Sequence, residues 1–499
     1  MSSTLFGQWS GDASNLLICG ASGEQAQSKV ATLEDGSSYI SWFDNRSGGY
    51  DLYMQYLDAS GQAMWDEGGE LIASRSFSWT MDYDLTIDGD DNAIVAYRNS
   101  GLGGDSIFVS SVSQSGVVDW TTNVGIGNQF AGPPQLCMSG GNVFVGWVDN
   151  GYSGLQKLDS DGNQVWKTSK TLYDPDGGSY SLTDLKPSDN GSVIASFVQY
   201  LFFSGAKQIR SMKINSDGSD AWGGQVSVMN SNSLQFGNYP EFISDGSGGV
   251  LYSWYGTSPL QVFAAHVNVD GTLIYEVQVA TGGLGVERVN PQSTRDGDEH
   301  IVFFNTLTNS QGNSGVSAQR LSSDGTRQWG TTGKSIQSPS NSPQRYVGAA
   351  ATIGGNATVF YQSVASFGQD LIFASSLNAK GEFVWESDSI EVSSVQSEKD
   401  DLSVGVGAGG YILAWDDARN GSPDIYAQRV NADGSLGEGL GEPCFGDING
   451  DGSVSVTDLL EIIAAWGNCS EDCSADLDED GTVGVTDLLE LIAAWGDCA

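Results

Sequence analysis

Two stretches near the C-terminus place oxygen-bearing side chains at alternate positions. Residues 447–458 read Asp-Ile-Asn-Gly-Asp-Gly-Ser-Val-Ser-Val-Thr-Asp, and residues 476–487 read Asp-Leu-Asp-Glu-Asp-Gly-Thr-Val-Gly-Val-Thr-Asp. Calcium is a hard ion that binds about six to eight oxygens, and EF-hand loops supply them from positions 1, 3, 5, 7, 9 and 12, with Gly at position 6. Both stretches follow this order, so the sequence predicts two calcium sites.

Each predicted loop has its own ligand set. The first would use the side chains of Asp447, Asn449, Asp451 and Asp458, the carbonyl of Ser453, and Ser455 through a water molecule. The second would use the side chains of Asp476, Asp478, Asp480 and Asp487 and the carbonyl of Thr482. Gly484 stands at position 9 of the second loop, so water must fill that ligand position. The competing interpretation is a pair of solvated acidic turns, but two full matches, each followed by a helical pattern, favour calcium.

Each loop leads directly into a segment with helical spacing. The apolar residues of the first segment are Leu459, Leu460, Ile463 and Trp466, and those of the second are Leu488, Leu489, Ile492 and Trp495. No helix fits before either loop, because Cys444-Phe445-Gly446 and Cys473-Ser474-Ala475 run straight into them. This differs from an ordinary EF-hand, which has a helix on both sides of its loop.

The duplicated loop-then-helix pattern resembles type I dockerin domains over residues 444–499. The resemblance implies a small helical calcium-binding domain that binds cohesin modules and attaches secreted proteins, often polysaccharide-degrading enzymes, to scaffolds. The sequence departs from many dockerins at loop positions 10 and 11, where Val456-Thr457 and Val485-Thr486 replace a Ser-Thr or similar polar pair. The resemblance implies a cohesin-like partner that binds residues 444–499, and this departure concerns the residue pairs at positions 10 and 11 alone.

Four of the six cysteines lie in the last 56 residues: Cys444, Cys469, Cys473 and Cys498. Their spacing lacks the CxxC pairs and nearby His typical of zinc sites, which favours disulfides and hence export. The pseudo-twofold that the dockerin resemblance implies favours Cys444–Cys498 and Cys469–Cys473, with Cys444–Cys469 and Cys473–Cys498 as the alternative. Cys19 and Cys137 are expected to be buried and unpaired.

A repeat of about 46–56 residues runs through positions 21–436, the range expected for four-stranded propeller blades. In each unit a turn Gly is followed four residues later by an aromatic: Gly61/Trp65, Gly116/Trp120, Gly162/Trp166, Gly218/Trp222, Gly271/Tyr275, Gly325/Trp329 and Gly381/Trp385. An eighth Gly, Gly434, is followed by Glu438 instead. Trp9 and Leu16-Leu17-Ile18 resemble the missing end of that unit.

The repeats predict a mainly β fold, a closed propeller with eight blades favoured and seven possible if residues 183–238 are an insertion. Residues 1–436 would form the propeller, with residues 1–20 supplying the outer strand of the last blade. Residues 437–443 would be a linker, and residues 444–499 the dockerin-like domain. The unit ending in Asp-Ile-Tyr-Ala-Gln-Arg-Val-Asn-Ala-Asp-Gly resembles uncharacterised extracellular repeats of bacterial surface proteins.

The first and last units share an Asp and an Arg after a strand Trp. Asp44 and Arg46 follow Trp42, and Asp417 and Arg419 follow Trp415 at the same offsets. Such a pair is able to bind a ligand, but on a hairpin loop it more often braces the loop. We therefore expect a structural role for both pairs.

Charge and hydropathy narrow the class of protein. The 62 acidic residues exceed the 21 basic ones, for a net charge of −41, which argues against nucleic-acid binding and docking to anionic membranes. No run of apolar residues is long enough to insert in a membrane. The first residues lack the pattern of a signal peptide, so either the protein is cytosolic or its signal peptide is absent from this sequence. The cysteine-rich tail favours an extracellular or cell-surface location.

Three functions remain compatible with these features. The leading one is a non-enzymatic protein whose propeller binds a ligand such as polysaccharide, with a calcium-dependent tail for attachment. The second is a glycoside hydrolase or polysaccharide lyase carried by a dockerin, and the third is a matrix or filament subunit stapled by calcium. The sequence has no Gly-x-Ser-x-Gly elbow and only two His, but glycosidases need only two carboxylates. No catalytic residue is assigned.

Overall fold

The computed structural model describes residues 8–75, 77, 80, 83–101, 104–126, 132–149, 151–175, 177–201, 205–229, 233–235, 237–437, 445–446, 448, 453–468, 474–478 and 481–497. The chain divides into two compact units, residues 1–437 and 438–499. Each is described by itself. The predicted linker at 437–443 lies almost entirely outside the described residues and stays a prediction.

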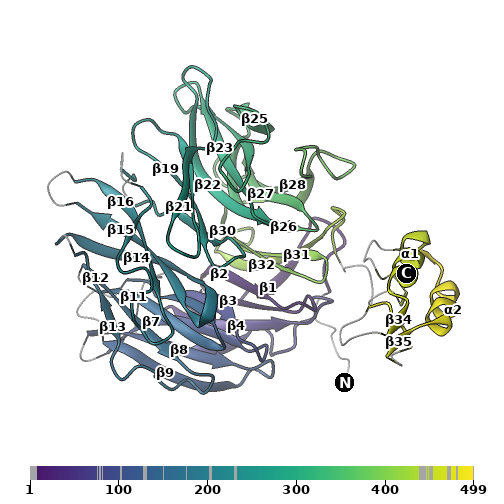
Figure 1. Cartoon of the computed structure of the whole chain (residues 1–499), viewed down its shortest axis with the longest axis horizontal. Coiled ribbons are helices and arrows are strands. Elements are labelled where there is room, and N and C mark those ends of the chain that lie inside the picture. The colour runs from purple at the N-terminus through teal and green to yellow at the C-terminus, as the bar shows by residue number, and fades with distance from the viewer. Residues whose placement is uncertain are drawn as a thin grey trace. The chain divides into compact units, whose positions relative to one another are not determined.

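Eight four-stranded antiparallel sheets make up the first unit (Figure 1). Blade 1 contains β2 (Gln25–Thr32), β3 (Ser38–Asp44), β4 (Asp51–Leu57) and β5 (Glu70–Ala73), and blade 2 contains β6 (Asp84–Ile87), β7 (Ala93–Gly101), β8 (Gly104–Val112) and β9 (Val118–Ile126). Blade 3 contains β10 (Gln135–Ser139), β11 (Asn142–Asp149), β12 (Tyr152–Leu158) and β13 (Lys170–Leu172), and blade 4 contains β14 (Ser179–Pro187), β15 (Val193–Tyr200), β16 (Lys207–Ile214) and β17 (Val226–Ser227). A short 3-10 turn, η1 (Asp189–Gly191), joins β14 to β15.

Blade 5 contains β18 (Glu241–Ser244), β19 (Val250–Tyr255), β20 (Val262–Val267) and β21 (Leu273–Gln278), and blade 6 contains β22 (Glu287–Asp296), β23 (Glu299–Thr308), β24 (Asn313–Leu321) and β25 (Lys334–Ser340). Blade 7 contains β26 (Gln344–Ile353), β27 (Asn356–Val364), β28 (Asp370–Leu377) and β29 (Ile390–Ser397), and blade 8 contains β30 (Lys399–Gly407), β31 (Gly410–Asp417), β32 (Asp424–Asn431) and β1 (Leu16–Cys19). The prediction of a mainly β, eight-bladed propeller is confirmed. The divergent region is blade 4, not an insertion.

The ring closes through the N-terminal strand. β1 pairs antiparallel with β32, Leu16 opposite Ala427 and Leu17 opposite Tyr426, so blade 8 combines both ends of the propeller sequence. The innermost strand of blade 1, β2, also contacts the innermost strands of blades 2 and 8. Closure of this kind leaves no blade without a neighbour on either face.

The second strand of each blade is buried on both faces because neighbouring blades cover both. Every residue of β3 and β31 is buried, which explains why these strands read as near-continuous apolar runs. The hydrophobic clusters lie between blades: Tyr39 and Phe43 of blade 1 pack with Val95 of blade 2 and with Tyr83, which directly precedes the first strand of blade 2. Burial of inter-blade aromatics therefore holds the ring together.

The repeated Gly and aromatic residues pack between blades, not within one. The indole of Trp9 lies 2.7 Å from where a Cβ on Gly61 would be, and its Nε1 donates to the carbonyl of Ala59 at 2.9 Å. The same contact recurs around the ring in the pairs Trp65–Gly116, Trp120–Gly162, Trp166–Gly218, Trp222–Gly271, Tyr275–Gly325, Trp329–Gly381 and Trp385–Gly434. Each Gly leaves room for the ring of the preceding blade, and Trp9 supplies the eighth aromatic.

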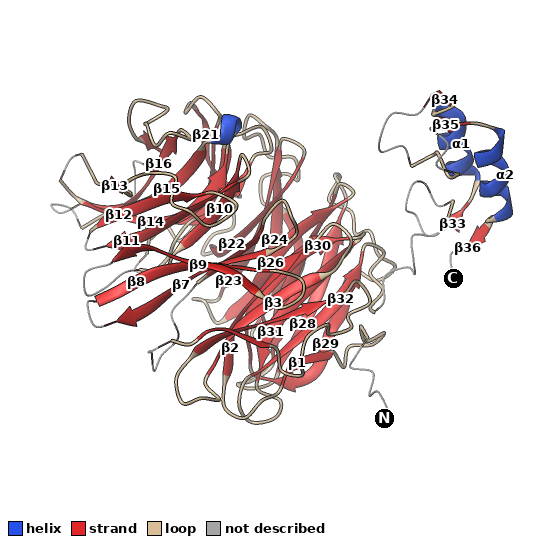
Figure 2. Cartoon of the chain, turned by 90° about the horizontal axis from the view of Figure 1, so that it is seen from below, coloured by secondary structure: helices blue, strands red, loops and turns tan. Residues whose placement is uncertain are grey.

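The second unit contains two helices, coloured blue in Figure 2. Its elements are β33 (Ser453–Val454), α1 (Val456–Ala464), β34 (Gly467–Asn468), β35 (Thr482–Val483), α2 (Val485–Ala493) and β36 (Gly496–Asp497). β33 pairs with β36 and β34 pairs with β35, so each loop is joined to the segment after the other helix. Val454, Ile462, Val483 and Leu491 form the centre of its small core.

Candidate functional site

The second calcium loop brings three carboxylates together. One oxygen from each of Asp476, Asp478 and Asp487 lies within 4.8 Å of the others. No Lys or Arg occurs between residues 444 and 499, so the chain supplies no nearby cation in this unit. Three converging carboxylates with no cation of their own fit a hard divalent ion, because the ion removes the repulsion among them.

Backbone donors hold Asp487 in place. Its Oδ1 accepts from the amides of Leu477 at 2.7 Å and Asp478 at 3.2 Å, and its Oδ2 accepts from the amide of Gly484 at 2.7 Å. Burial alone would raise the pKa of Asp487, but these amides lower it. The side chain at position 12 is therefore ionised and oriented into the loop, as a calcium ligand must be.

The first loop shows the same arrangement where it is described. Asp458 is fully buried and accepts from the amides of Ile448 at 2.9 Å and Ser455 at 2.8 Å. The Ser455 hydroxyl accepts from the Thr457 amide at 3.3 Å and so caps α1. Four of the predicted ligands, Asp447, Asn449, Asp451 and Asp480, lie outside the described residues. Ser453 and Thr482 begin the short strands β33 and β35.

The tail helices leave matching apolar stripes exposed. Side chains between 47% and 63% exposed recur at equivalent positions: Val456, Leu460, Ile463 and Trp466 on the first repeat, and Val485, Leu489, Ile492 and Trp495 on the second. The sequence placed Leu459 and Leu488 on the same apolar stripes, but in the structure these two side chains pack against the core instead. Exposed apolar surface of this kind marks an interaction site.

The tail cysteines Cys444, Cys469, Cys473 and Cys498 lie outside the described residues, so their disulfides stay a prediction. The expectation for the other two cysteines is confirmed: Cys19 and Cys137 are free and buried. Burial raises the pKa of the Cys19 thiol to about 11 and that of Cys137 to about 12, so neither is a reactive thiolate.

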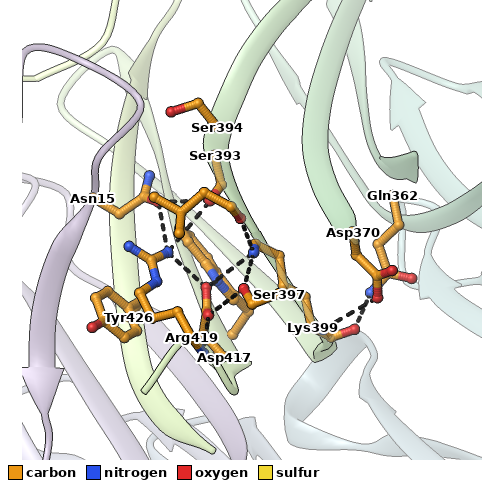
Figure 3. A network of polar contacts seen from close by, with 12 residues as sticks. Asn15, Gln362, Asp370, Ser393, Ser394, Ser397, Lys399, Asp417, Arg419 and Tyr426 are labelled. Carbon is orange, nitrogen blue, oxygen red and sulfur yellow. Dashed lines mark hydrogen bonds and ion pairs between the residues drawn. The ribbon is translucent and has the colours of Figure 1, made fainter. Parts of the chain in front are cut away.

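The hairpin acid of blade 8 is saturated with donors (Figure 3). Asp417 accepts from Trp415 Nε1 at 3.0 Å, the Arg419 amide at 3.0 Å, Arg419 Nη2 at 2.6 Å and Ser397 Oγ at 2.6 Å. Lys399 Nζ lies 3.2 Å away, and both side chains are fully buried. Burial alone would raise the pKa of Asp417, but the bonds from Arg419, Ser397 and Trp415 lower it to about 2. No capacity remains for a ligand.

Blade 1 repeats this brace with a different last partner. Asp44 accepts from Trp42 Nε1 at 3.0 Å, the Arg46 amide at 2.9 Å and Arg46 Nη2 at 2.5 Å. Gln25 stands opposite Asp44 in the strand register, where blade 8 has Lys399 opposite Asp417, and the thiol of Cys19 donates to Asp44 at 3.8 Å. Each Arg also stacks on a tyrosine, Arg46 on Tyr53 and Arg419 on Tyr426. Both pairs therefore brace their hairpins. Lys399 was not predicted from the sequence, because it stands among acidic residues that resemble a solvated turn.

Comparison with known proteins identifies the tail. Residues 445–494 match the family model of the dockerin type I domain. Dockerin type I domains bind calcium and bind cohesin modules. No curated protein matches the sequence.

Solved structures share the propeller fold at low sequence identity. Sqt1 from Chaetomium thermophilum is 13% identical with a TM-score of 0.50, over 83% of this chain and 98% of that one. The Dos1 propeller is 12% identical with a TM-score of 0.47, over 84% of this chain and 95% of that one. Puromycin hydrolase is 10% identical with a TM-score of 0.45, over 83% of this chain, which spans 62% of the hydrolase chain. These likenesses concern the fold alone.

Proposed function

We propose that this is a secreted or cell-surface protein in which a non-enzymatic propeller binds polysaccharide and a dockerin tail attaches it to a cohesin-like module. The dockerin match at residues 445–494 supports the attachment and the location. No helix among the described residues is long and apolar enough to cross a membrane.

The tail would hold two calcium ions. The proposed ligands are Asp447, Asn449, Asp451, Ser453, Ser455 and Asp458 in the first loop, and Asp476, Asp478, Asp480, Thr482 and Asp487 in the second. The convergence of Asp476, Asp478 and Asp487 supports this set. When bound, each ion would join a loop to the helix that follows it, because position 12 lies in the first turn of that helix.

The exposed apolar stripes carry the attachment proposal. Leu460 and Leu489 are 58% and 60% exposed, which is costly in water unless a partner covers them. Residues 444–499 contain 13 acidic residues and no Lys or Arg, so the partner surface should be apolar at the centre and basic or neutral at the rim.

The histidines support a non-enzymatic propeller. His300 is fully buried, lies 2.9 Å from Ser293 Oγ, and burial lowers its pKa to about 3. His266 lies 2.9 Å from Asp245 Oδ2 within blade 5. Both rings therefore have structural partners inside blades, and neither is placed at an exposed site as a general base would be.

Binding of the full chain to an immobilised type I cohesin module tests the attachment. We expect binding in calcium that disappears in excess EGTA. The double substitution Leu460→Asp and Leu489→Asp should weaken it about 100-fold or more, since truncating central apolar contacts commonly costs above 2 kcal/mol. Val117→Asp, at an exposed apolar position of the propeller, should bind normally. Calcium-independent binding, or no binding to any type I cohesin, would contradict the proposal.

A second experiment tests the absence of catalysis. The full chain is incubated with soluble plant and algal polysaccharides, and reducing ends and unsaturated uronates are measured. We expect binding in affinity electrophoresis without either product. Accumulation of either product above a heat-treated control would replace the binding module with an enzyme.

A further inference from the structure

One residue on each innermost strand occupies the same register. Its partner is the residue immediately before an aromatic of the second strand of the blade. Lys29 thus pairs with Ser41, and Glu241 pairs with Ser253. We call the eight residues the axial layer. In blade order they are Lys29, Asp84, Gln135, Asp184, Glu241, Gln292, Ala349 and Ser403.

The axial layer is polar on one side of the ring. Five consecutive blades, 2 to 6, contribute an Asp, Glu or Gln, whereas blades 7 and 8 contribute the small residues Ala349 and Ser403. A packed interior position would be expected to hold apolar side chains in every blade. In blades 1, 4, 6, 7 and 8 the strand is irregular immediately before this residue. Bulges of this kind re-aim the side chain that follows.

Solvent reaches the axial layer. All of its members except Ala349 are partly exposed, although they lie on the strands that the ring encloses. The side chain of Asp184 is 22% exposed and that of Lys186, two residues further on the same strand, is 28% exposed. These side chains are therefore accessible to a ligand as well as to water.

Two carboxylates of the axial layer, Asp84 and Glu241, are short of donors, whereas Asp184 accepts from the Leu185 amide and from Lys186 Nζ, both at 2.6 Å. Asp84 accepts only from the amides of Leu85 at 2.9 Å and Leu136 at 2.7 Å, within the described residues. Under the same restriction, the only hydrogen bond to the Glu241 side chain comes from Gln292 at 3.0 Å. A carboxylate has about four acceptor positions, so each has spare capacity. Burial raises the pKa of Asp84 to about 6 and that of Glu241 to about 7, which agrees with this shortage.

The exposed aromatics of the propeller lie at the end of the blades where the innermost strands begin. Among the described propeller residues four aromatic side chains are exposed: Tyr173 (67%), Tyr200 (39%), Tyr239 (65%) and Phe367 (87%). Tyr173 and Tyr239 lie in connections between the last strand of one blade and the first strand of the next. Phe367 lies in a connection between the second and third strands of one blade, and Tyr200 is the last residue before such a connection. Antiparallel pairing places both kinds of connection at the start of the innermost strands, where Asp84, Gln135 and Glu241 are the first residues.

We infer that the axial layer and these aromatics together bind a neutral polysaccharide chain. Sugar hydroxyls would donate to Asp84 and Glu241 and exchange hydrogen bonds with the two Gln amides, while the apolar faces of sugar rings stack on tyrosine. A polyanionic chain is disfavoured, because Lys29 and Lys186 do not balance the three carboxylates and the whole chain carries a charge of −41. The inference rests on the proposed polysaccharide-binding function and assigns its site and ligand class.

Calorimetry on the full chain tests the site with neutral hexasaccharides of xylose, glucose and mannose, and with an alginate hexasaccharide as the polyanion. We expect one neutral hexasaccharide or more to bind. Glu241→Ala should weaken that binding about tenfold or more, as for the loss of a hydrogen bond to a charged group. Tyr239→Ala should weaken it severalfold. Glu276→Ala, on the outermost strand of the same blade, is the matched control and should bind as the parent does.

The outcomes separate the two levels of the argument. Binding of a neutral hexasaccharide that Glu241→Ala and Tyr239→Ala leave unchanged would overturn the site and keep the proposed function. Preference for the alginate hexasaccharide would overturn the ligand class. If the parent chain binds none of these sugars, the proposed function of the propeller fails together with the inference. Thermal melting and cohesin binding of each variant confirm that a loss is not due to misfolding.

Discussion

Carboxylates meet opposite surroundings in two regions of the propeller: Asp417 is fully buried, and Asp84 and Glu241 are partly exposed. In the blade 8 hairpin, Asp417 has four hydrogen-bond donors and a buried lysine, and its pKa falls to about 2. On the axis, Asp84 and Glu241 have one or two donors each, and burial raises their pKa values to about 6 and about 7. The supply of donors, more than burial, thus separates a structural brace from a group that can still accept a ligand.

The tail adds a third situation, in which the missing partner must come from solution. Asp476, Asp478 and Asp487 converge in a unit that has no cationic side chain. The hairpin carboxylates are paired with cationic side chains of the protein itself. The axial carboxylates keep unfilled acceptor positions, and the carboxylates of the tail loops need a metal ion. The following predictions test these differences.

Removal of calcium should have the largest effect. Chelation, or Asp476→Ala together with Asp447→Ala, should unfold α1 and α2 and leave the propeller intact, because the loop carboxylates repel one another without the ion. Hydrogen exchange on the full chain measures this, with residues 456–464 and 485–493 losing protection while β31 keeps it. Calorimetry should count two calcium ions per chain. Unchanged protection of both helices in EDTA would show that the tail folds without metal.

Asp417→Asn should come next. It leaves Lys399 and Arg419 buried without an anion, and removing one partner of a buried pair costs about 3–5 kcal/mol of unfolding free energy. Urea denaturation monitored by the tryptophan fluorescence of the propeller measures the loss of unfolding free energy. Asp433→Asn, in an exposed turn at the opposite end of β32, serves as the control. A loss below about 1 kcal/mol would place this pair with ordinary surface ion pairs.

Asp44→Asn should cost less than Asp417→Asn. The two hairpins share their Trp and Arg donors, but the neutral Gln25 stands in blade 1 at the register position of the buried lysine, Lys399. We expect about 1–3 kcal/mol, the cost of weakening hydrogen bonds to a charged group. The same urea experiment measures it, and equal losses in both variants would show that Lys399 adds nothing.

Substitutions in the axial layer should have the smallest effect, with the opposite sign. The pKa values of Asp84 and Glu241 are raised by folding, so the native state holds more protons and the stability they contribute is present below about pH 4 and lost as the pH rises through 6 and 7. Asp84→Asn and Glu241→Gln should therefore raise the melting temperature at pH 8 and leave it unchanged at pH 4.

The groups that act on these two acids are Lys29, Asp184, Lys186 and Gln292. Asp417 provides the contrast within one titration, since its pKa is lowered and its contribution is lost only as the pH falls towards 2. A melting temperature lowered at pH 8 by Glu241→Gln would mean that the axial carboxylate stabilises the fold, as a brace does.

Repeats and loops were accessible from the sequence because their determinants are local. The Gly-to-aromatic spacing predicted eight blades, and the alternating oxygens at 447–458 and 476–487 predicted the dockerin fold that the family match confirms. The helical spacing placed Leu459 and Leu460 on one stripe, but only packing decided that Leu459 joins the core while Leu460 is exposed. Adjacent positions on a helix differ by about 100° in direction, and spacing alone does not say which one faces inward.

The sequence by itself determined the elements, their number and the chemistry of the metal loops, since turn residues, strand patterns and ligand spacing act over a few positions. Only the tertiary structure decided that each aromatic packs on the Gly of the next blade, that Lys399 reaches Asp417, and that eight residues of six types share the axial layer. These relations join residues that strand register and ring closure bring together. For residues separated by about fifty positions in the chain, residue type alone does not determine which side chains come into contact or how many hydrogen-bond donors each one has.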